Sequence, residues 1–289
     1  MSQFLMYKLS QSVCDSIPRQ LAYSVADCLM DVYYLSSSKM RRVVENNLQL
    51  ALRNPTSDLP YNVRQVFRNF GRYMVDFFQI NHVDREFMIE HVRVSGLRNL
   101  RKALSHRRGG IILTAHLGNW ELGGAVLSRM GYPSLGVALP HEDPEVNEFF
   151  NHKRTANGLE TVTPGLAFRR CLQRLKQKKL VSIVGDYDFS GHGETVAFLG
   201  RPTSIPKGPA VMSLRTGAPI IPAFMIRDDN DHYVLTIGEP IFSPAELTSE
   251  NRVEPGVLKS FVQKYIQVLE SEIIRHPSQW LMFRKICAQ

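Results

Sequence analysis

The chain has 289 residues, of which 44% are hydrophobic and 21% charged, so its composition is that of a globular enzyme and excludes a disordered protein. Its net charge of +8 predicts an anionic partner, such as a phosphorylated lipid, a nucleic acid or an acidic carrier protein. The cysteines are widely spaced and form neither a Cys-x-x-Cys pair nor a Cys/His cluster with zinc spacing, which favours a reducing compartment.

The N-terminal part of the chain reads as helical, because apolar residues recur at about four-residue spacing over most of it. Pro18 is expected to divide or kink this stretch, and further helices are predicted at 39–52 and 61–80. We interpret residues 1–85 as a helical N-terminal subdomain. Its apolar face either packs against the rest of the protein or lies in the headgroup region of a membrane.

Membrane-spanning and secretory signals are not predicted. A transmembrane helix needs roughly 20 consecutive apolar residues, whereas polar residues such as Lys8 and Asp15 interrupt the N-terminal stretch. No apolar segment with a small-residue cleavage site follows the first residue, as a signal peptide would require. Any membrane contact is therefore expected at the protein surface, as in a peripheral or monotopic protein.

The rest of the chain, residues 86–289, alternates short apolar segments with helical ones. This pattern predicts an α/β fold with a mostly parallel central sheet flanked by helices, as one continuous domain. Strands are predicted at 92–94, 110–115, 134–139, 180–184, 195–199, 219–226 and 233–237. Helices are predicted at 97–104, 120–130, 145–157, 166–177, 206–216 and 255–275. Ligands of such sheets bind beyond the carboxyl ends of the strands.

One segment at such a strand end, His116-Leu-Gly-Asn-Trp-Glu121, carries residues suited to catalysis. Gly118 permits a tight turn after His116, and Asn119 is a good N-cap for the following helix. Glu121 then falls in the first helical turn, where the helix dipole favours a carboxylate. A carboxylate near an imidazole holds one tautomer and leaves the other ring nitrogen as a general base. We therefore take His116 and Glu121 as candidate catalytic residues; a structural histidine and a dipole-matching glutamate also fit the pattern.

This His-x-x-x-x-Glu segment resembles the signature of the lysophospholipid acyltransferase superfamily, and its flanks resemble the bacterial lipid A biosynthesis (lauroyl/myristoyl) branch. Further motifs agree with that branch in order and spacing: Arg154 with Gly158, Gly185-Asp-Tyr-Asp188, the block Phe198 to Pro222, and His276-Pro-Ser-Gln-Trp280. The resemblance covers residues 40 to 285. Tyr187 stands where the family often has Gln, Trp280-Leu-Met-Phe283 lacks a second Trp, and the hydrophobic N-terminal anchor of the family is weak here.

The resemblance implies an acyltransferase that moves a fatty acyl chain from an acyl carrier protein or CoA thioester to the hydroxyl of a lipid A precursor. It implies no cofactor and no metal, although a metal site including His192 is conceivable, and it places the protein at the cytoplasmic face of the bacterial inner membrane. A lysophospholipid, a phosphatidylinositol mannoside or an aminolipid is an alternative acceptor. A non-catalytic lipid-binding protein is a further alternative. A serine hydrolase is disfavoured because Gly-x-Ser-x-Gly is absent.

The candidate substrate-binding residues are Asn119, Arg154, Asp186, Asp188, Arg201, Lys207 and Gly208. The resemblance implies that Arg154 binds a phosphate or the phosphopantetheine region of the carrier, a role that suits the planar guanidinium fork. Asp186 and Asp188 follow an apolar strand, where they would orient the catalytic loop or the acceptor. Lys207 and Gly208 open a helix whose backbone amides would bind an anion. Surface or capping roles are the alternatives for these residues.

Basic residues cluster in two runs, Arg101 to Arg108 and Arg169 to Lys179, and no acidic residue lies between Thr161 and Gly185. The second run is either a solvated helix face or a docking surface for an acidic acyl carrier protein or an anionic membrane. Nucleic acid is not expected, because no recognised binding motif accompanies the charge and aromatic residues do not interleave with it.

Overall fold

The computed structural model describes residues 2–52, 58–244 and 255–286. Within them a seven-stranded sheet has the order β1-β9-β8-β2-β5-β3-β4, and β6 and β7 form a separate antiparallel hairpin. The sheet strands are β1 (Val92–Ser95), β2 (Gly110–Thr114), β3 (Ser134–Val137), β4 (Leu159–Val162), β5 (Leu180–Val184), β8 (Ile220–Arg227) and β9 (Tyr233–Ile237). Neighbouring strands are parallel except β8 and β9. The predicted α/β fold with a mostly parallel sheet is confirmed.

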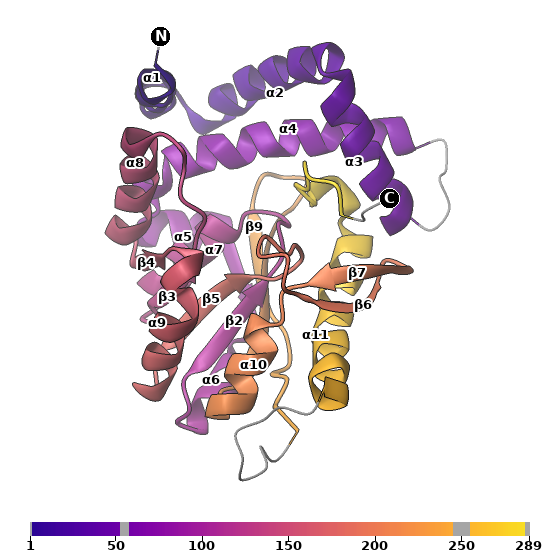
Figure 1. Ribbon diagram of the computed structural model, residues 1–289. Coiled ribbons are helices and arrows are strands. Elements are labelled where there is room, and N and C mark those ends of the chain that lie inside the picture. Colours follow the sequence, from indigo (N-terminus) through magenta and orange to yellow (C-terminus); the bar gives the residue numbers. More distant parts are fainter. Residues whose placement is uncertain (1, 53–57, 245–254, 287–289) are drawn as a thin grey trace.

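Helices cover both faces of this sheet (Figure 1). On one face, α6 (Leu97–Ser105) and α7 (Trp120–Arg129) pack with Ile112 and Ile221 in a common core. On the other, α9 (Pro164–Lys176), α10 (Gly208–Thr216) and α11 (Pro255–Arg275) surround Ile111 and Leu113. The side chains of β2 are buried on both faces, which explains the continuous apolar run of its sequence. Helix α8 (Pro144–Ala156) packs against β4.

The N-terminal region is helical as predicted: α1 (Gln3–Ser16), α2 (Arg19–Ser36), α3 (Ser38–Ala51), α4 (Leu59–Phe78) and the short α5 (Arg85–His91). Pro18 does divide the first stretch. The residue before it, Ile17, is extended (φ −127°, ψ 154°), which is the conformation that a following proline favours. Helix α4 is largely buried and lies between α2 and the rest of the molecule (Figure 1).

Helix α2 is fixed to α4 by ion pairs and carries an apolar outer face. Asp31 pairs with Arg64 and Arg68, in each case at 2.5 Å, and Asp27 pairs with Arg72 at 2.6 Å. The exposed faces of α1 and α2 carry large apolar side chains: Leu5, Leu9, Val13, Leu21, Val25, Leu29, Val32 and Leu35. None of the described helices is both long enough and apolar enough to cross a membrane. On α2, the acidic side chains of Asp27 and Asp31 thus face α4, whereas its large apolar side chains face outward.

Two strands and one α-helix of the described residues were absent from the sequence prediction. Strand β4 lies at the edge of the sheet and is only partly buried, so its sequence Leu-Glu-Thr-Val has no apolar run. Strand β7 (Arg201–Ile205) contains Pro202 and alternates exposed with buried residues in the hairpin with β6 (Glu194–Phe198). Helix α5 has no buried residue, and therefore no apolar periodicity marks it in the sequence.

Candidate active site

The turn after β2 presents His116 at the carboxyl end of the strand, as predicted. Gly118 has φ +62°, and a Cβ at this position would lie 2.0 Å from the carbonyl oxygen of Met225, so only glycine fits. The backbone N–H of Asn119 donates to that same oxygen at 2.8 Å. Asn119 is the N-cap of α7, and its side chain accepts from the N–H of Leu122 at 3.0 Å. The turn is thereby pinned to β8.

The C-terminal segment holds the same turn from the other side. The N–H of Gly118 donates to the carbonyl of Gln279 at 2.9 Å, and that of Leu281 donates to the carbonyl of His116 at 2.7 Å. Between them, Leu117 and Trp280 form an antiparallel bridge. The closing motif of the sequence therefore supports the backbone on which His116 sits.

The imidazole of His116 is bonded to Asp186 and not to Glu121, the partner that the sequence analysis expected. Nδ1 lies 2.8 Å from Asp186 Oδ1, and the backbone N–H of His116 donates to Oδ2 at 3.0 Å. Trp280 Nε1 also donates to Oδ2, at 2.9 Å. Asp186 follows β5, which pairs with β2, so the register of the two strands brings both residues to the same sheet edge. Trp280 is thus both a core residue and a support of the site.

Asp186 is fully buried yet ionised. Burial opposes its ionisation, but His116 and the hydrogen bond from Trp280 outweigh this and hold the pKa of Asp186 below its usual value. An ionised carboxylate on Nδ1 fixes the tautomer of the imidazole. The His116 side chain is 22% exposed, so its ring is accessible from the pocket described below.

Glu121 is paired with Arg154. The guanidinium approaches Glu121 Oε1 through Nε at 2.9 Å and through Nη2 at 2.7 Å. Burial alone would lower the pKa of Arg154, but the charge of Glu121 and its hydrogen bonds raise it, so the pair is ionic. Burial and the charge of Glu121 also raise the pKa of the adjacent Tyr73, which keeps this phenol protonated. Arg154, which the resemblance implied would bind a phosphate or the phosphopantetheine region of the carrier, uses Nε and Nη2 to bind Glu121.

A pocket of about 820 Å³ opens at the carboxyl edge of the sheet. Of the candidate catalytic and substrate-binding residues, it brings together His116, Glu121, Arg154, Asp188, Lys207 and Gly208. Asn119 and Arg201 do not line it: Asn119 is buried in the fold, and Arg201 is exposed on β7. Asp186 reaches the pocket only through His116.

Asp188 shapes the rim of this pocket. Its carboxylate accepts hydrogen bonds from the N–H groups of Ser190 and Gly193 and from the hydroxyls of Ser190 and Ser204. Burial raises the pKa of Asp188, but these hydrogen bonds together lower it by more, so the net pKa is below the usual value. Asp188 therefore organises the loop between β5 and β6. Lys207 is the N-cap of α10.

The pocket extends along both faces of the sheet, which the sequence did not indicate. Under α7 it is lined by Ile112, Gly123, Gly124, Leu127, Gly136, Met225 and Leu235. Under α9 and α10 it is lined by Ala167, Cys171, Ile183 and Met212. His141, also unpredicted, lies at the wall with its ring centroid 4.3 Å from that of Phe150. Burial and the charge of Arg154 lower the pKa of His141.

The fold and the site define an α/β protein with an imidazole–carboxylate pair at the edge of a long, mainly apolar pocket, an arrangement suited to general-base chemistry on a lipid. The chain belongs to the bacterial lipid A biosynthesis acyltransferase family, whose model matches residues 9–286.

Curated relatives of two kinds are similar to the chain. A phosphatidylinositol mannoside acyltransferase of Mycolicibacterium smegmatis is 27% identical over 184 residues, which are 62% of this chain and 60% of that relative's length. The protein of the same name from Mycobacterium tuberculosis is 25% identical over 223 residues, 75% of this chain and 67% of the relative. A lipid A biosynthesis palmitoleoyltransferase of Escherichia coli is 23% identical over 252 residues, 84% of this chain and 77% of the relative.

Proposed function

We propose that the protein transfers a fatty acyl chain from a thioester to a lipid hydroxyl, with His116 as general base. The observation that carries this proposal is the His116 imidazole, anchored by Nδ1 on buried Asp186 while its ring borders the pocket. The acceptor hydroxyl gives its proton to Nε2 as its oxygen attacks the thioester carbonyl. The C–S bond of the resulting tetrahedral intermediate then breaks, and the thiolate takes the proton from the imidazolium.

The carboxylates would have separate roles in this reaction. Asp186 stabilises the imidazolium, because it is ionised, buried and in direct contact with Nδ1. Glu121, instead of contacting the imidazole as expected, forms with Arg154 an ion pair on the wall of the mainly apolar pocket. Such a pair is suited to the polar part of the acceptor. The transfer is direct, so a ternary complex forms and no acyl-enzyme is required.

The acyl chain would lie in the part of the pocket under α7. Ile112, Met225 and Leu235 give this part an apolar wall, and Gly123, Gly124 and Gly136 leave room where side chains would otherwise stand. An extended alkyl chain gains about 0.8 kcal/mol for each methylene that it buries in such a slot.

The donor would be an acyl carrier protein or acyl-CoA, both of which are anionic. Exposed basic residues of α9 and the loop that follows it support this assignment: Arg169, Arg170, Lys176, Lys178 and Lys179. The start of the same helix borders the pocket through Pro164 and Phe168, so a donor docked there would be close to the site.

The acceptor would be a lipid A precursor, reached from the cytoplasmic face of the bacterial inner membrane. The apolar outer faces of α1 and α2 support a peripheral or monotopic attachment. Leu139, Phe168 and Phe189 are exposed at the pocket itself, which supports entry of a lipid from the surface. The mycobacterial relatives are named for another acceptor, phosphatidylinositol mannoside, which is therefore the second candidate.

The test is to incubate purified protein with labelled acyl carrier protein or acyl-CoA and a panel of acceptors: lipid A precursor, phosphatidylinositol mannoside, lysophospholipid and aminolipid. We expect label to appear in one acceptor, preferentially the lipid A precursor, and not with the His116→Ala variant. Binding of the acceptors without any labelled product would identify a non-catalytic lipid-binding protein instead. Ping-pong kinetics or a trapped acyl-enzyme would contradict the direct transfer.

A further inference from the structure

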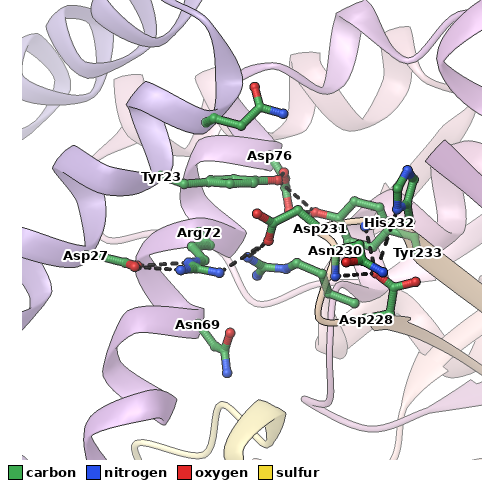
Figure 2. Close-up of polar contacts among 12 residues, drawn as sticks. Tyr23, Asp27, Asn69, Arg72, Asp76, Asp228, Asn230, Asp231, His232 and Tyr233 are labelled. Carbon is green, nitrogen blue, oxygen red and sulfur yellow. Dashed lines mark hydrogen bonds and ion pairs between the residues drawn. The ribbon is translucent and has the colours of Figure 1, made fainter. Parts of the chain in front are cut away.

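A buried carboxylate on α4 lies at the junction of the N-terminal helices and the catalytic turn. Asp76 is 1% exposed and accepts hydrogen bonds from Tyr23 of α2, from Tyr233 of β9 and from Asn119 Nδ2, the last at 2.9 Å. Figure 2 shows the side chains of Tyr23, Asp76 and Tyr233 converging. Building on the proposed function, we infer that Asp76 is a positioning residue that couples α2 to the turn carrying His116.

The coupling acts through the orientation of the Asn119 amide. Its Oδ1 accepts from the N–H of Leu122 to start α7, while its Nδ2 donates to Asp76. Nδ2 is the donor of this amide and Oδ1 its acceptor, so the contact with the carboxyl oxygen of Asp76 turns the NH₂ group toward Asp76 and leaves Oδ1 for the helix. Because Asn119 follows His116 by three residues, a change in this amide is transmitted to the catalytic turn.

Tyr23 and Tyr233 hold Asp76 in place as donors. Burial, followed by the charge of Asp76, raises the pKa of both phenols, so both stay protonated. The guanidinium of Arg227, itself buried, lies 5.1 Å from the ring centroid of Tyr23 and supplies a nearby positive charge. Tyr23 lies on α2, so a change in the position of α2 changes the orientation of Asp76.

Two substitutions on α2 separate this coupling from general attachment of the helix. Tyr23→Phe removes a donor to Asp76 and keeps the ring. Asp31→Asn instead weakens the ion pairs of α2 with Arg64 and Arg68, away from Asp76. We expect Tyr23→Phe to lower kcat by roughly tenfold with KM values unchanged, because a small displacement of a catalytic group costs rate more than binding. Asp31→Asn should leave kcat within about twofold.

A second variant tests the same coupling from the Asn119 side, so the test does not depend on correct folding of Tyr23→Phe alone. Asn119→Ser keeps a capping oxygen but removes the donor to Asp76, and it should lower kcat similarly. The double variant Tyr23→Phe/Asn119→Ser should lose no more activity than the less active of the two single variants, because both substitutions break the same chain of contacts. Unchanged kcat in Tyr23→Phe and Asn119→Ser, additive losses, or an equal loss in Asp31→Asn would overturn the inference.

An NMR measurement makes the result independent of the acyl transfer itself. The side-chain amide signals of Asn119 and the ring signals of His116 should shift in Tyr23→Phe and stay in place in Asp31→Asn. Shifts of this kind in a protein that transfers no acyl chain would retain the coupling and refute only the proposed function. Unmoved signals in Tyr23→Phe would refute the coupling whatever the activity.

Discussion

The imidazole of His116 is hydrogen-bonded to the carboxylate of Asp186, with His116 Nδ1 and Asp186 Oδ1 2.8 Å apart. Glu121, although nearer to His116 in the sequence, is not its partner. Glu121 is held by Arg154 at 2.7 Å. The site therefore contains two carboxylates with different partners. The partner of Asp186 is a cation only when His116 is protonated, whereas the partner of Glu121, Arg154, is always a cation.

Asp186→Asn should lower kcat by about 10²- to 10⁴-fold with little change in KM, because an amide at this position no longer favours the tautomer with a proton on Nδ1. Steady-state kinetics against donor and acceptor would measure this. The matched control is Asp188→Asn, in which a carboxylate of the same loop is changed without contact to His116. A kcat of Asp186→Asn equal to that of the control would contradict the assigned role.

Arg154→Leu should destabilise the fold by about 3–5 kcal/mol, since it leaves the buried charge of Glu121 without its partner. Replacing both residues, as Arg154→Leu/Glu121→Leu, should recover part of that loss. Denaturant unfolding at pH 7 gives both free energies. The exposed Arg170→Leu is the control and should change stability by no more than about 0.5 kcal/mol. A double variant less stable than Arg154→Leu would show that the pair is not self-contained.

Gly124→Leu should shift the preferred donor toward shorter chains. A Cβ at Gly124 would meet only the side chain of Leu159, with the nearest atom at 3.5 Å, so the backbone tolerates a side chain there and the added atoms occupy the pocket under α7. Each methylene displaced from the slot should cost about fourfold in kcat/KM. Activity against a series of donor chain lengths measures the shift. Gly256→Leu, at an open position on α11, should leave the profile unchanged; an altered KM for the acceptor alone would place the acyl chain elsewhere.

Asp31 should stabilise the protein at neutral pH and lose this effect as the solution becomes strongly acidic. Hydrogen bonds from Arg64 and then Arg68 lower its pKa in the folded state, so the unfolded chain binds the proton more tightly. Its contribution is therefore present above the unfolded pKa of about 4 and is lost as pH falls toward the folded value. Urea unfolding of the wild type and Asp31→Asn should differ at pH 7 and converge at low pH. A difference that grows on acidification would refute this sign.

The turn that carries His116 was predictable because its signals are local. The apolar run of β2, Gly118 in a left-handed conformation and the Asn119 cap are each specified by neighbouring residues, and all three are present in the structure. The partner of His116 was not predictable in this way. It depends on the pairing of β2 with β5, which brings Asp186 beside a residue 70 positions earlier in the chain.

The second role of Asn119 was also beyond local reasoning. Its contact with Asp76 joins α7 to α4 and exists only after both helices have packed. Asn119 was therefore predicted to bind substrate, whereas the residue is buried in the fold and does not line the pocket. Residues of the apolar slot were missed for the same reason, since they come from α7 and from several strands of the sheet and share no motif.

The turnover of His116→Ala, measured with labelled thioester donor and the best acceptor of the panel, tests the general-base assignment most directly. We predict a loss of at least about 10³-fold in kcat, with the circular dichroism spectrum and thermal midpoint of the wild type retained. A folded His116→Ala variant that turns over within about tenfold of the wild type would contradict the assignment, because no general base is expected to contribute so little.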